Sequence, residues 1–122
     1  MRPSPTFIFS AANVAALKKA LRNEYPNIRS SHADEALAAS FGFKTHAAML
    51  IVLRQLDGAA RLIVGVDHVQ LAVRLAQLGY LHVSAARLWS FVWTIEFPVR
   101  QYDDEGERSI RMQLMPDAAN SP

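Results

Sequence analysis

The apolar residues of this 122-residue chain change their spacing near residue 60, and this change limits the folds that are open to it. In the first half they recur every three or four residues, which is the period of an amphipathic helix. In the second half, β-branched runs and alternating apolar residues suit strands. The sequence therefore predicts an α+β fold, in which an N-terminal layer of three helices packs on a small, mainly antiparallel sheet with one further helix.

The three helices expected before residue 60 have capping signals at both ends. The predicted N-caps are Ser10, Ser31 and Thr45, and Asp34 follows Ser31 at the spacing of a capping box. Apolar residues at intervals of three and four follow each cap, so one face of each helix is expected to be buried. The predicted helix ends are Pro26, Gly42 and the pair Asp57-Gly58.

The second half begins with a short strand and a helix. The β-branched run from Arg61 to Val66 predicts a strand, and Asp67 is placed to cap the helix that follows. From His68 to Leu78 the apolar residues return to a helical period, and Gly79 is the expected left-handed stop. One helix is thus embedded among the strands.

An aromatic stretch near residue 90 has the clearest alternation in the chain. Large apolar side chains occupy every second position there, which predicts a strand. They are Trp89, Phe91, Trp93, Ile95 and Phe97. Residues 110–114 alternate again, so the two strands are expected to pair as a hairpin around an acidic turn at residues 103–107. The aromatic face is expected to fill the core, and any part left uncovered would form a homodimer or partner interface.

Composition places the chain among globular proteins of one domain. With 122 residues, 51% of them apolar and 20% charged, it can bury a core without metal or disulfide support. We expect a single domain over residues 1–122, with a helical part at 10–58, a mixed part at 61–115, and tails at 1–5 and 116–122. The absence of cysteine excludes disulfides, thiolate metal sites and a thiolate nucleophile.

The sequence contains neither a membrane-spanning pattern nor a secretory signal. The apolar stretch from Met49 to Leu53 is closed by Arg54 and Gln55, so it is too short to span a bilayer. The stretch from Met1 to Pro5 lacks the long apolar region of a signal peptide. We therefore expect a cytoplasmic protein that has no membrane partner.

The formal charge of +2 is the sum of a basic half and an acidic half. Residues 1–61 carry eight basic and four acidic groups, whereas residues 62–122 carry five basic and seven acidic groups. Local charge of this kind guides a partner to one end of a molecule. The candidate partner-binding residues are the basic group Lys18, Lys19, Arg22 and Arg29 and the acidic group Asp103, Asp104, Glu105 and Glu107.

The segment from Glu35 to Met49 has the spacing of a helix-turn-helix motif. A small residue, Ala38, precedes the turn residue Gly42, and this combination lets two helices approach closely. The second helix is mostly apolar, so a packed helical hairpin is the other interpretation. If the motif binds DNA, the side chains that approach the groove are Lys44, Thr45, His46 and Arg54, with Lys18, Lys19 and Arg22 on the phosphates.

Residues 11–56 resemble the small helical domain that accompanies glyoxalase-related proteins in bacteria. The resemblance rests on an Ala-Leu-Ala helix and on the turn from Gly42 to His46, where that family often has Gly-Phe-x-x-Trp. His46 here replaces the aromatic residue. The segment is also similar to small uncharacterised proteins of plasmids and other bacterial mobile elements. This second likeness implies an accessory protein of a mobile element.

A second stretch, from Val66 to Val73, is similar to the first strand of glyoxalase and bleomycin-resistance proteins. In that family the histidine of this strand binds a metal, so the resemblance implies His68 as a ligand and Glu96 as the best carboxylate candidate. The family encloses its metal with two βαβββ modules, and this chain has room for one. A dimer would supply the second module. Gly79 also follows the stretch sooner than its counterpart in the family does.

Three functions are thus compatible with the sequence, and one of them is the leading prediction. The chain lacks a nucleophile motif, a glycine-rich phosphate loop and closely spaced histidine pairs, so we expect no enzymatic activity and no cofactor or bound metal. The leading prediction is a bacterial mobile-element accessory protein that binds a macromolecule, in the first instance a protein, and inhibits host defence in the manner of an anti-CRISPR protein. The alternatives are a helix-turn-helix DNA-binding regulator and a metal-dependent glyoxalase-like protein.

Overall fold

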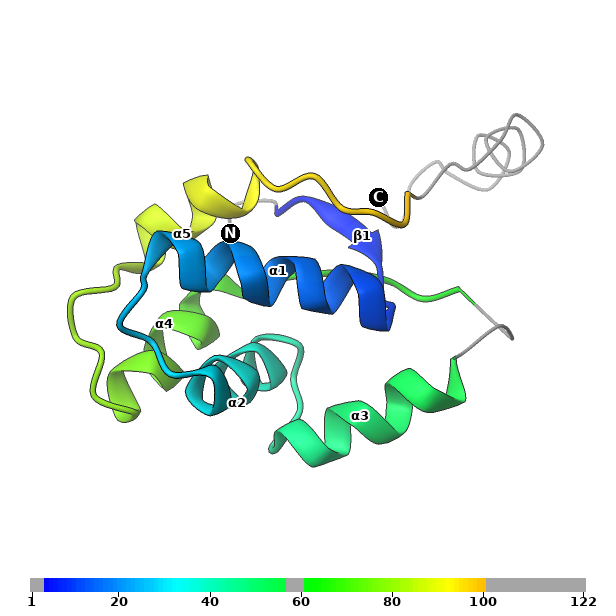
Figure 1. Cartoon of the computed structure of the whole chain (residues 1–122), viewed down its shortest axis with the longest axis horizontal. Coiled ribbons are helices and arrows are strands. Elements are labelled where there is room, and N and C mark those ends of the chain that lie inside the picture. The colour runs from blue at the N-terminus through cyan, green and yellow to red at the C-terminus, as the bar shows by residue number, and fades with distance from the viewer. Residues whose placement is uncertain (1–3, 57–60, 101–122) are drawn as a thin grey trace.

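Residues 4–56 and 61–100 are described by the structure, a computed structural model in which helices and short strands follow one another along the chain (Figure 1). Within these residues the two strands form one antiparallel sheet. The predicted α+β class is therefore confirmed, as are three helices before residue 60. The elements in chain order are β1 (Thr6–Ile8), α1 (Ala11–Glu24), α2 (Ser30–Ser40), α3 (His46–Gln55), β2 (Ile63–Gly65), α4 (His68–Gln77) and α5 (Ala85–Val92).

Three helices begin at the capping residues that the sequence predicts. Ser10 Oγ and Thr45 Oγ1 each accept the backbone N–H three residues on, at 3.1 and 3.0 Å. Asp67 Oδ1 accepts the N–H groups two and three residues on, at 3.1 and 3.0 Å. These bonds satisfy donors that the first turn of a helix leaves without a helical partner. Gly42 and Gly79 have φ angles of 90° and 102°, which confirms the two left-handed turns after α2 and α4.

The predicted capping box at Ser31 and Asp34 is wrong. The N-cap of α2 is Arg29, two residues before Ser31, and its side chain makes no capping hydrogen bond within the described part of the chain. The backbone N–H of Arg29 donates to Tyr80 Oη at 3.1 Å instead, and this contact helps to hold the start of α2. Asp34 is used elsewhere, because its carboxylate pairs with Lys18 of α1 at 2.8 Å.

The sequence predicts β2 but not β1. β2 falls inside the strand expected from Arg61 to Val66. β1 has only three residues, and its partner lies far along the chain, with Phe7 opposite Val64. A strand this short is fixed by tertiary pairing and packing, which local sequence patterns do not reveal.

The predicted aromatic strand from Trp89 to Phe97 is wrong, because the stretch begins as a helix. Ser84 Oγ accepts the N–H of Arg87 at 3.2 Å and caps α5. Leu88 and Val92, one helical turn apart, are then buried in the core. The alternation that predicts a strand also contains a repeat at four residues, and the capping and packing of this helix favour the second period.

The aromatic residues of this stretch consequently do not share one face. Trp89 and Trp93 contact each other edge to face with ring centroids 6.2 Å apart, and Trp93 is 51% exposed. Phe91 packs partly buried against the main core. Phe97 lies beyond the helix and stacks on Phe7 of β1, with ring centroids 4.2 Å apart and an interplanar angle of 14°. The aromatic side chains of this stretch thus lie in three places: on the surface, in the core and against the sheet.

Four of the predicted features lie outside the described residues. They are the helix end at Asp57-Gly58, the acidic turn at 103–107, the second hairpin strand at 110–114 and the tail at 116–122. The first strand of the predicted hairpin is not formed, because its residues belong to α5 and the segment after it.

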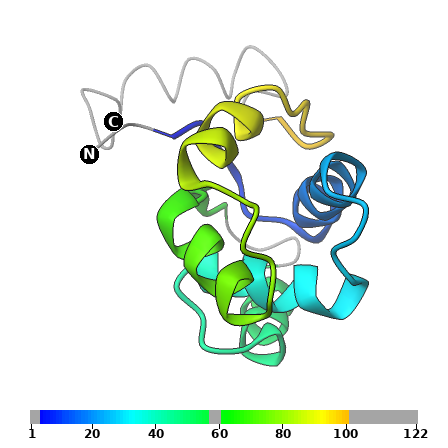
Figure 2. The same cartoon turned by 90° about the vertical axis from the view of Figure 1, so that its left-hand side faces the viewer.

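Four helices enclose the main hydrophobic core. Figure 2 shows α1 and α4 on opposite sides, with α2 below and α5 above. The large apolar side chains of these helices that are fully or almost fully buried are Leu17, Leu21, Leu37, Leu71, Leu75, Leu88 and Val92. α3 packs on a second, smaller cluster instead. That cluster consists of Met49 and Leu53 of α3 with Phe9, Val14 and Ala38.

The side chain of Asn13 joins the two ends of the described chain. Its Nδ2 donates to the carbonyl of Ile8 at 2.8 Å and to the carbonyl of Val99 at 2.9 Å. Its Oδ1 accepts the N–H of Val99, also at 2.9 Å. Asn13 is completely buried, so each of these bonds replaces a contact with water that the group cannot make. The amide thus holds the segment after α5 against the start of α1 and the end of β1.

Replacing Asn13 with alanine is expected to lower the free energy of unfolding by about 3 kcal/mol, because the backbone groups of Ile8 and Val99 lose their partners. Urea denaturation followed by circular dichroism measures this change. The matched control is Asn23→Ala, at an exposed position of the same helix. It should change the free energy by less than about 0.5 kcal/mol. Equal effects of the two substitutions would contradict the role of Asn13.

Candidate functional site

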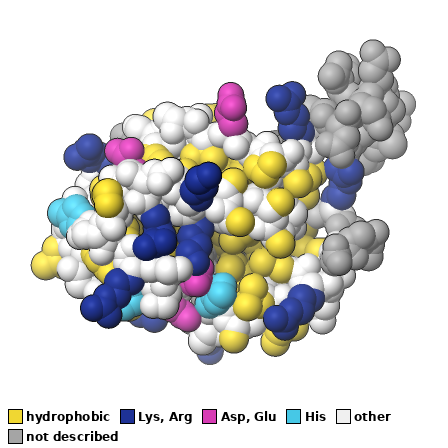
Figure 3. Space-filling view, viewed as in Figure 1, with side chains coloured by type: hydrophobic (Ala, Val, Ile, Leu, Met, Phe, Trp, Pro, Cys, Tyr) yellow, Lys and Arg dark blue, Asp and Glu magenta, His cyan; other side chains and the backbone are white. Residues whose placement is uncertain are grey.

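The exposed surface of α1, α2 and α3, which we call the helical face, carries most of the predicted binding residues. Figure 3 shows this face toward the viewer. Basic side chains gather on one half of it, together with carboxylates and histidines. Apolar side chains gather on the other half, between α1 and α3. The two halves differ in the chemistry that they offer to a partner.

A polar cluster marks the place where the three helices of this face meet. Lys18 Nζ lies 2.8 Å from Asp34 Oδ1, and the same oxygen lies 3.9 Å from His46 Nε2. Glu35 Oε1 accepts the backbone N–H of His46 at 3.2 Å, so it satisfies a donor at the start of α3. Two carboxylates of α2 therefore bind groups of both neighbouring helices. The structure brings together Lys18 and His46, which the DNA-binding hypothesis assigns to the phosphates and to the groove.

The ion pair reduces the positive charge that this face presents. The side chains of Lys18 and Asp34 are 27% and 24% exposed, and such a pair contributes at most about 1 kcal/mol to stability. Its larger effect is electrostatic, because a neutralised lysine attracts an anionic partner less than a solvated one does. Arg22 is also engaged, since its Nε donates to the carbonyl of Ile28 at 3.0 Å.

The remaining two residues of the predicted basic group lie at different places. Arg29 is exposed at the start of α2. Lys19 lines a groove of about 440 Å³ between α1 and residues 94–96, which also contains Glu96. The four basic residues thus differ in their surroundings, and two of them are held by contacts within the chain. The predicted acidic group, Asp103, Asp104, Glu105 and Glu107, lies outside the described residues.

The outward surface of α3 combines apolar and basic side chains. Ile51 is 54% exposed at the middle of the helix, and Ala47, one turn earlier, is exposed as well. Lys44 before the helix and Arg54 in its last turn are exposed at the two ends. We call this surface, consisting of Lys44, Ala47, Ile51 and Arg54, the α3 patch. Thr45 is predicted to approach DNA, but its hydroxyl caps the helix.

Sequence reasoning did not single out Ile51 as a functional residue, although a signal for it exists. The inward positions of α3 are Met49 and Leu53, which are four residues apart. Ile51 stands midway between them, so it points to the opposite side of a helix. An isoleucine on the side of a helix opposite to its buried residues can therefore be predicted from the sequence to be exposed.

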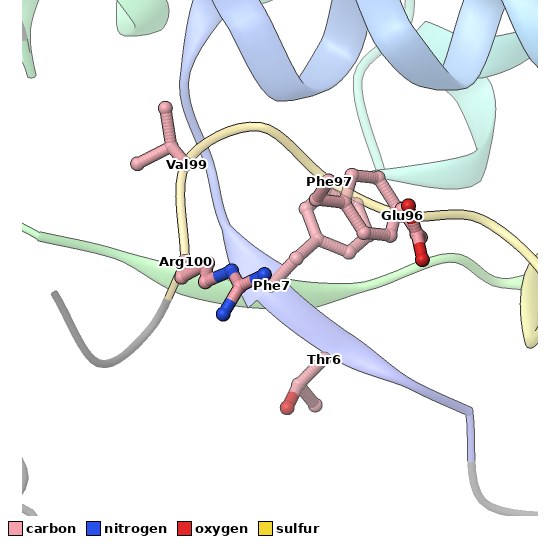
Figure 4. A pocket seen from close by; sticks show the side chains of 6 residues that line it. All are labelled: Thr6, Phe7, Glu96, Phe97, Val99 and Arg100. Atoms are coloured by element: carbon pink, nitrogen blue, oxygen red, sulfur yellow. The ribbon is translucent and has the colours of Figure 1, made fainter.

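A small pocket lies where β1 meets the segment after α5 (Figure 4). Its volume is about 240 Å³, and Figure 4 shows the stacked rings of Phe7 and Phe97 in its wall. Glu96 and Arg100 lie on either side of these rings. The other lining residues are Thr6 and Val99. The wall of the pocket is thus mainly the outer surface of the Phe7–Phe97 stack, and it carries one negative charge, Glu96, and one positive charge, Arg100.

The two residues that the glyoxalase resemblance implies as metal ligands lie in different settings. His68 is the first residue of α4, and its Nδ1 is buried without a hydrogen-bond partner in the described part of the chain. Glu96 lines the small pocket, on the other side of the Phe7 and Phe97 rings from Arg100. Among residues 4–56 and 61–100, no group of three or more histidine, aspartate or glutamate side chains is arranged to hold a metal. Residues 68–73 also form a helix, not the strand that the resemblance implies.

Comparison with protein families, with curated proteins and with solved structures finds no match to this chain. No helix among the described residues has the length and apolar character needed to cross a membrane. The candidate site therefore has to be judged from its own residues.

Divalent zinc, nickel or manganese is expected to leave the melting temperature of the protein unchanged. One imidazole supplies one ligand, whereas a protein zinc site needs three or four. Thermal unfolding with and without each ion measures the effect. A rise of several degrees that disappears in His68→Ala would contradict this expectation, because a ligand that binds only the folded state must stabilise it.

Proposed function

We propose that this chain is a non-enzymatic binding protein and that the α3 patch docks on a protein partner. The observation that carries the proposal is the 54% exposure of Ile51 at the centre of the outward surface of α3. An isoleucine that is half exposed on a helix gains about 1 kcal/mol or more when a partner covers it. The helix itself is already formed, so docking does not have to order it.

The chemistry of the α3 patch defines the partner that it fits. Apolar side chains lie at its centre and cations at both ends, which is the usual division of a protein interface into an apolar core and a polar rim. An amphipathic helix of this kind binds in an apolar groove of another protein. The cations Lys44 and Arg54 suit acidic groups at the two ends of such a groove.

The proposal extends to the biological setting. α3 lies inside residues 11–56, the segment that resembles proteins of bacterial mobile elements. We therefore place the chain among accessory proteins of mobile elements, with a protein of the host defence machinery as the partner. The α3 patch supplies the contact in this proposal, and no cofactor takes part.

DNA binding is the competing function, and the surroundings of α3 argue against it. A recognition helix offers polar side chains to base edges, whereas the centre of this one offers Ala47 and Ile51. The ring of His46 faces Asp34, whose carboxylate repels phosphate. Lys44 and Arg54 remain exposed and are common to both functions.

Replacing Ile51 with lysine is expected to reduce capture of a protein partner from a bacterial lysate by about tenfold or more, because it puts a charge at the centre of the interface. Capture is measured by mass spectrometry after nuclease treatment. The matched control is Val73→Lys, which changes a 44% exposed valine on α4 and should leave capture intact.

Two results would overturn the proposal. One is equal capture by wild type and Ile51→Lys. The other is capture that nuclease abolishes, together with duplex binding that weakens steeply with salt and is lost in Lys44→Glu.

A further inference from the structure

β2 is an edge strand of the sheet, and some of its backbone N–H and carbonyl groups face away from β1. Phe9 N–H donates to the carbonyl of Leu62 at 2.7 Å, so these two residues form a hydrogen-bonded pair. Because such pairs alternate along an antiparallel ladder, Phe7 and Val64 form the next one. The backbone groups of Ile63 and Gly65 therefore point away from β1, toward the outer edge of β2.

This edge is open at Ile63 and Gly65, whereas beyond the strand the backbone N–H of Asp67 donates to the carbonyl of Ser40 at the end of α2 at 3.1 Å. β1 is the one element, among those that the structure describes, with which β2 makes extensive contact. Two apolar side chains beside the edge are also exposed, Leu62 by 43% and Ile63 by 40%. Proteins usually protect a sheet edge with lysine, proline or a bulge, and the stretch from Leu62 to Val66 contains neither lysine nor proline. The edge has the features of a strand that pairs with another strand.

We propose that β2 pairs in antiparallel fashion with β2 of a second copy of this chain, about a twofold axis at Val64. The product is one four-stranded sheet with the order β1, β2, β2, β1. A two-stranded sheet is marginally stable by itself, and doubling it adds a ladder to both copies. The same surface meets itself, as a twofold interface requires.

The backbone and the side chains agree on this register. Centring on Val64 puts Ile63 opposite the partner's Gly65, and both residues direct their N–H and carbonyl groups to the outer edge. Each such pair exchanges two hydrogen bonds, and the twofold axis generates the pair twice. Gly65 has no side chain, and the space above it is bordered by its own chain, 3.5 Å from the Pro5 carbonyl oxygen and 3.7 Å from Ser4 Cβ, so the Ile63 side chain of the other copy packs beside these atoms.

The charges at the ends of the strand also match in this register. Arg61 stands opposite the partner's Asp67, and the twofold axis repeats this pair at the other end. Arg61 already has a contact within its own chain, but a guanidinium has five N–H donors and can serve two acceptors. Asp67 caps α4 with Oδ1, which leaves Oδ2 for the guanidinium. Shifting the register by two residues removes this match.

Sedimentation analysis over a range of protein concentrations tests the interface. The wild type is expected to be a dimer at high micromolar protein concentrations. Ile63→Lys brings a like charge from each copy to the edge, so it should weaken the dimer by about a hundredfold or more while the circular dichroism spectrum stays the same. Ile51→Lys, a matched change on α3, should leave the dimer intact. A monomeric wild type, or a dimer unaffected by Ile63→Lys, would overturn the proposal.

Cysteine cross-linking tests the register, because the chain has no cysteine of its own. Residues of a hydrogen-bonded pair have Cα atoms about 5.5 Å apart, within the range of a disulfide. A mixture of Ile63→Cys and Gly65→Cys should therefore form a cross-linked dimer upon oxidation, whereas either variant alone should not. A Cβ at Gly65 meets no atom closer than 3.5 Å, so the monomer accepts the substitution.

Cross-linking of Ile63→Cys alone at the rate of the mixture would overturn this register. The dimer and the proposed function fail separately, since the first depends on Ile63 and the second on Ile51.

Discussion

The fold depends on the buried amide of Asn13, which is the group that joins elements from opposite ends of the described chain. An asparagine carboxamide presents an N–H and its oxygen on the same side, so it can pair with both backbone groups of one residue as a neighbouring strand does. Here it pairs with both backbone groups of Val99 and also binds the carbonyl of Ile8. This arrangement places Phe97 on Phe7 and closes the main core on the side of β1. An apolar residue of similar size would fill the space but leave these backbone groups unsatisfied.

Local signals predict much of the helical part of this fold. Ser10, Thr45 and Asp67 each cap the helix that the sequence assigns to them, because a capping hydrogen bond forms within three residues. Such a bond depends little on the rest of the molecule. The same holds for Gly42 and Gly79, whose positive φ angles suit a residue without a side chain.

The errors arise where distant contacts decide the structure. The stretch around Trp93 fits both a strand and a helix, and the core that receives Leu88 and Val92 favours the helix. Ser31 has the sequence of a cap, but α2 begins after Arg29, whose backbone N–H donates to Tyr80 from a distant part of the chain. Of the candidate site, the sequence identifies the basic residues and not their partners. The pairing of Lys18 with Asp34, which lowers the charge of the helical face, becomes visible only when two helices are in place.

The division of the core into two clusters has a consequence for how the molecule moves. α3 rests on the smaller cluster, and its main helical neighbour is α2. Local opening of a protein follows such units, because a helix that shares few buried contacts can detach at a lower free energy than the whole domain needs to unfold. We therefore expect the amide hydrogens of α3 to exchange with solvent through openings that leave α1, α2, α4 and α5 packed. A partner bound to the α3 patch would suppress these openings, so binding would slow exchange in one helix and leave the main core unchanged.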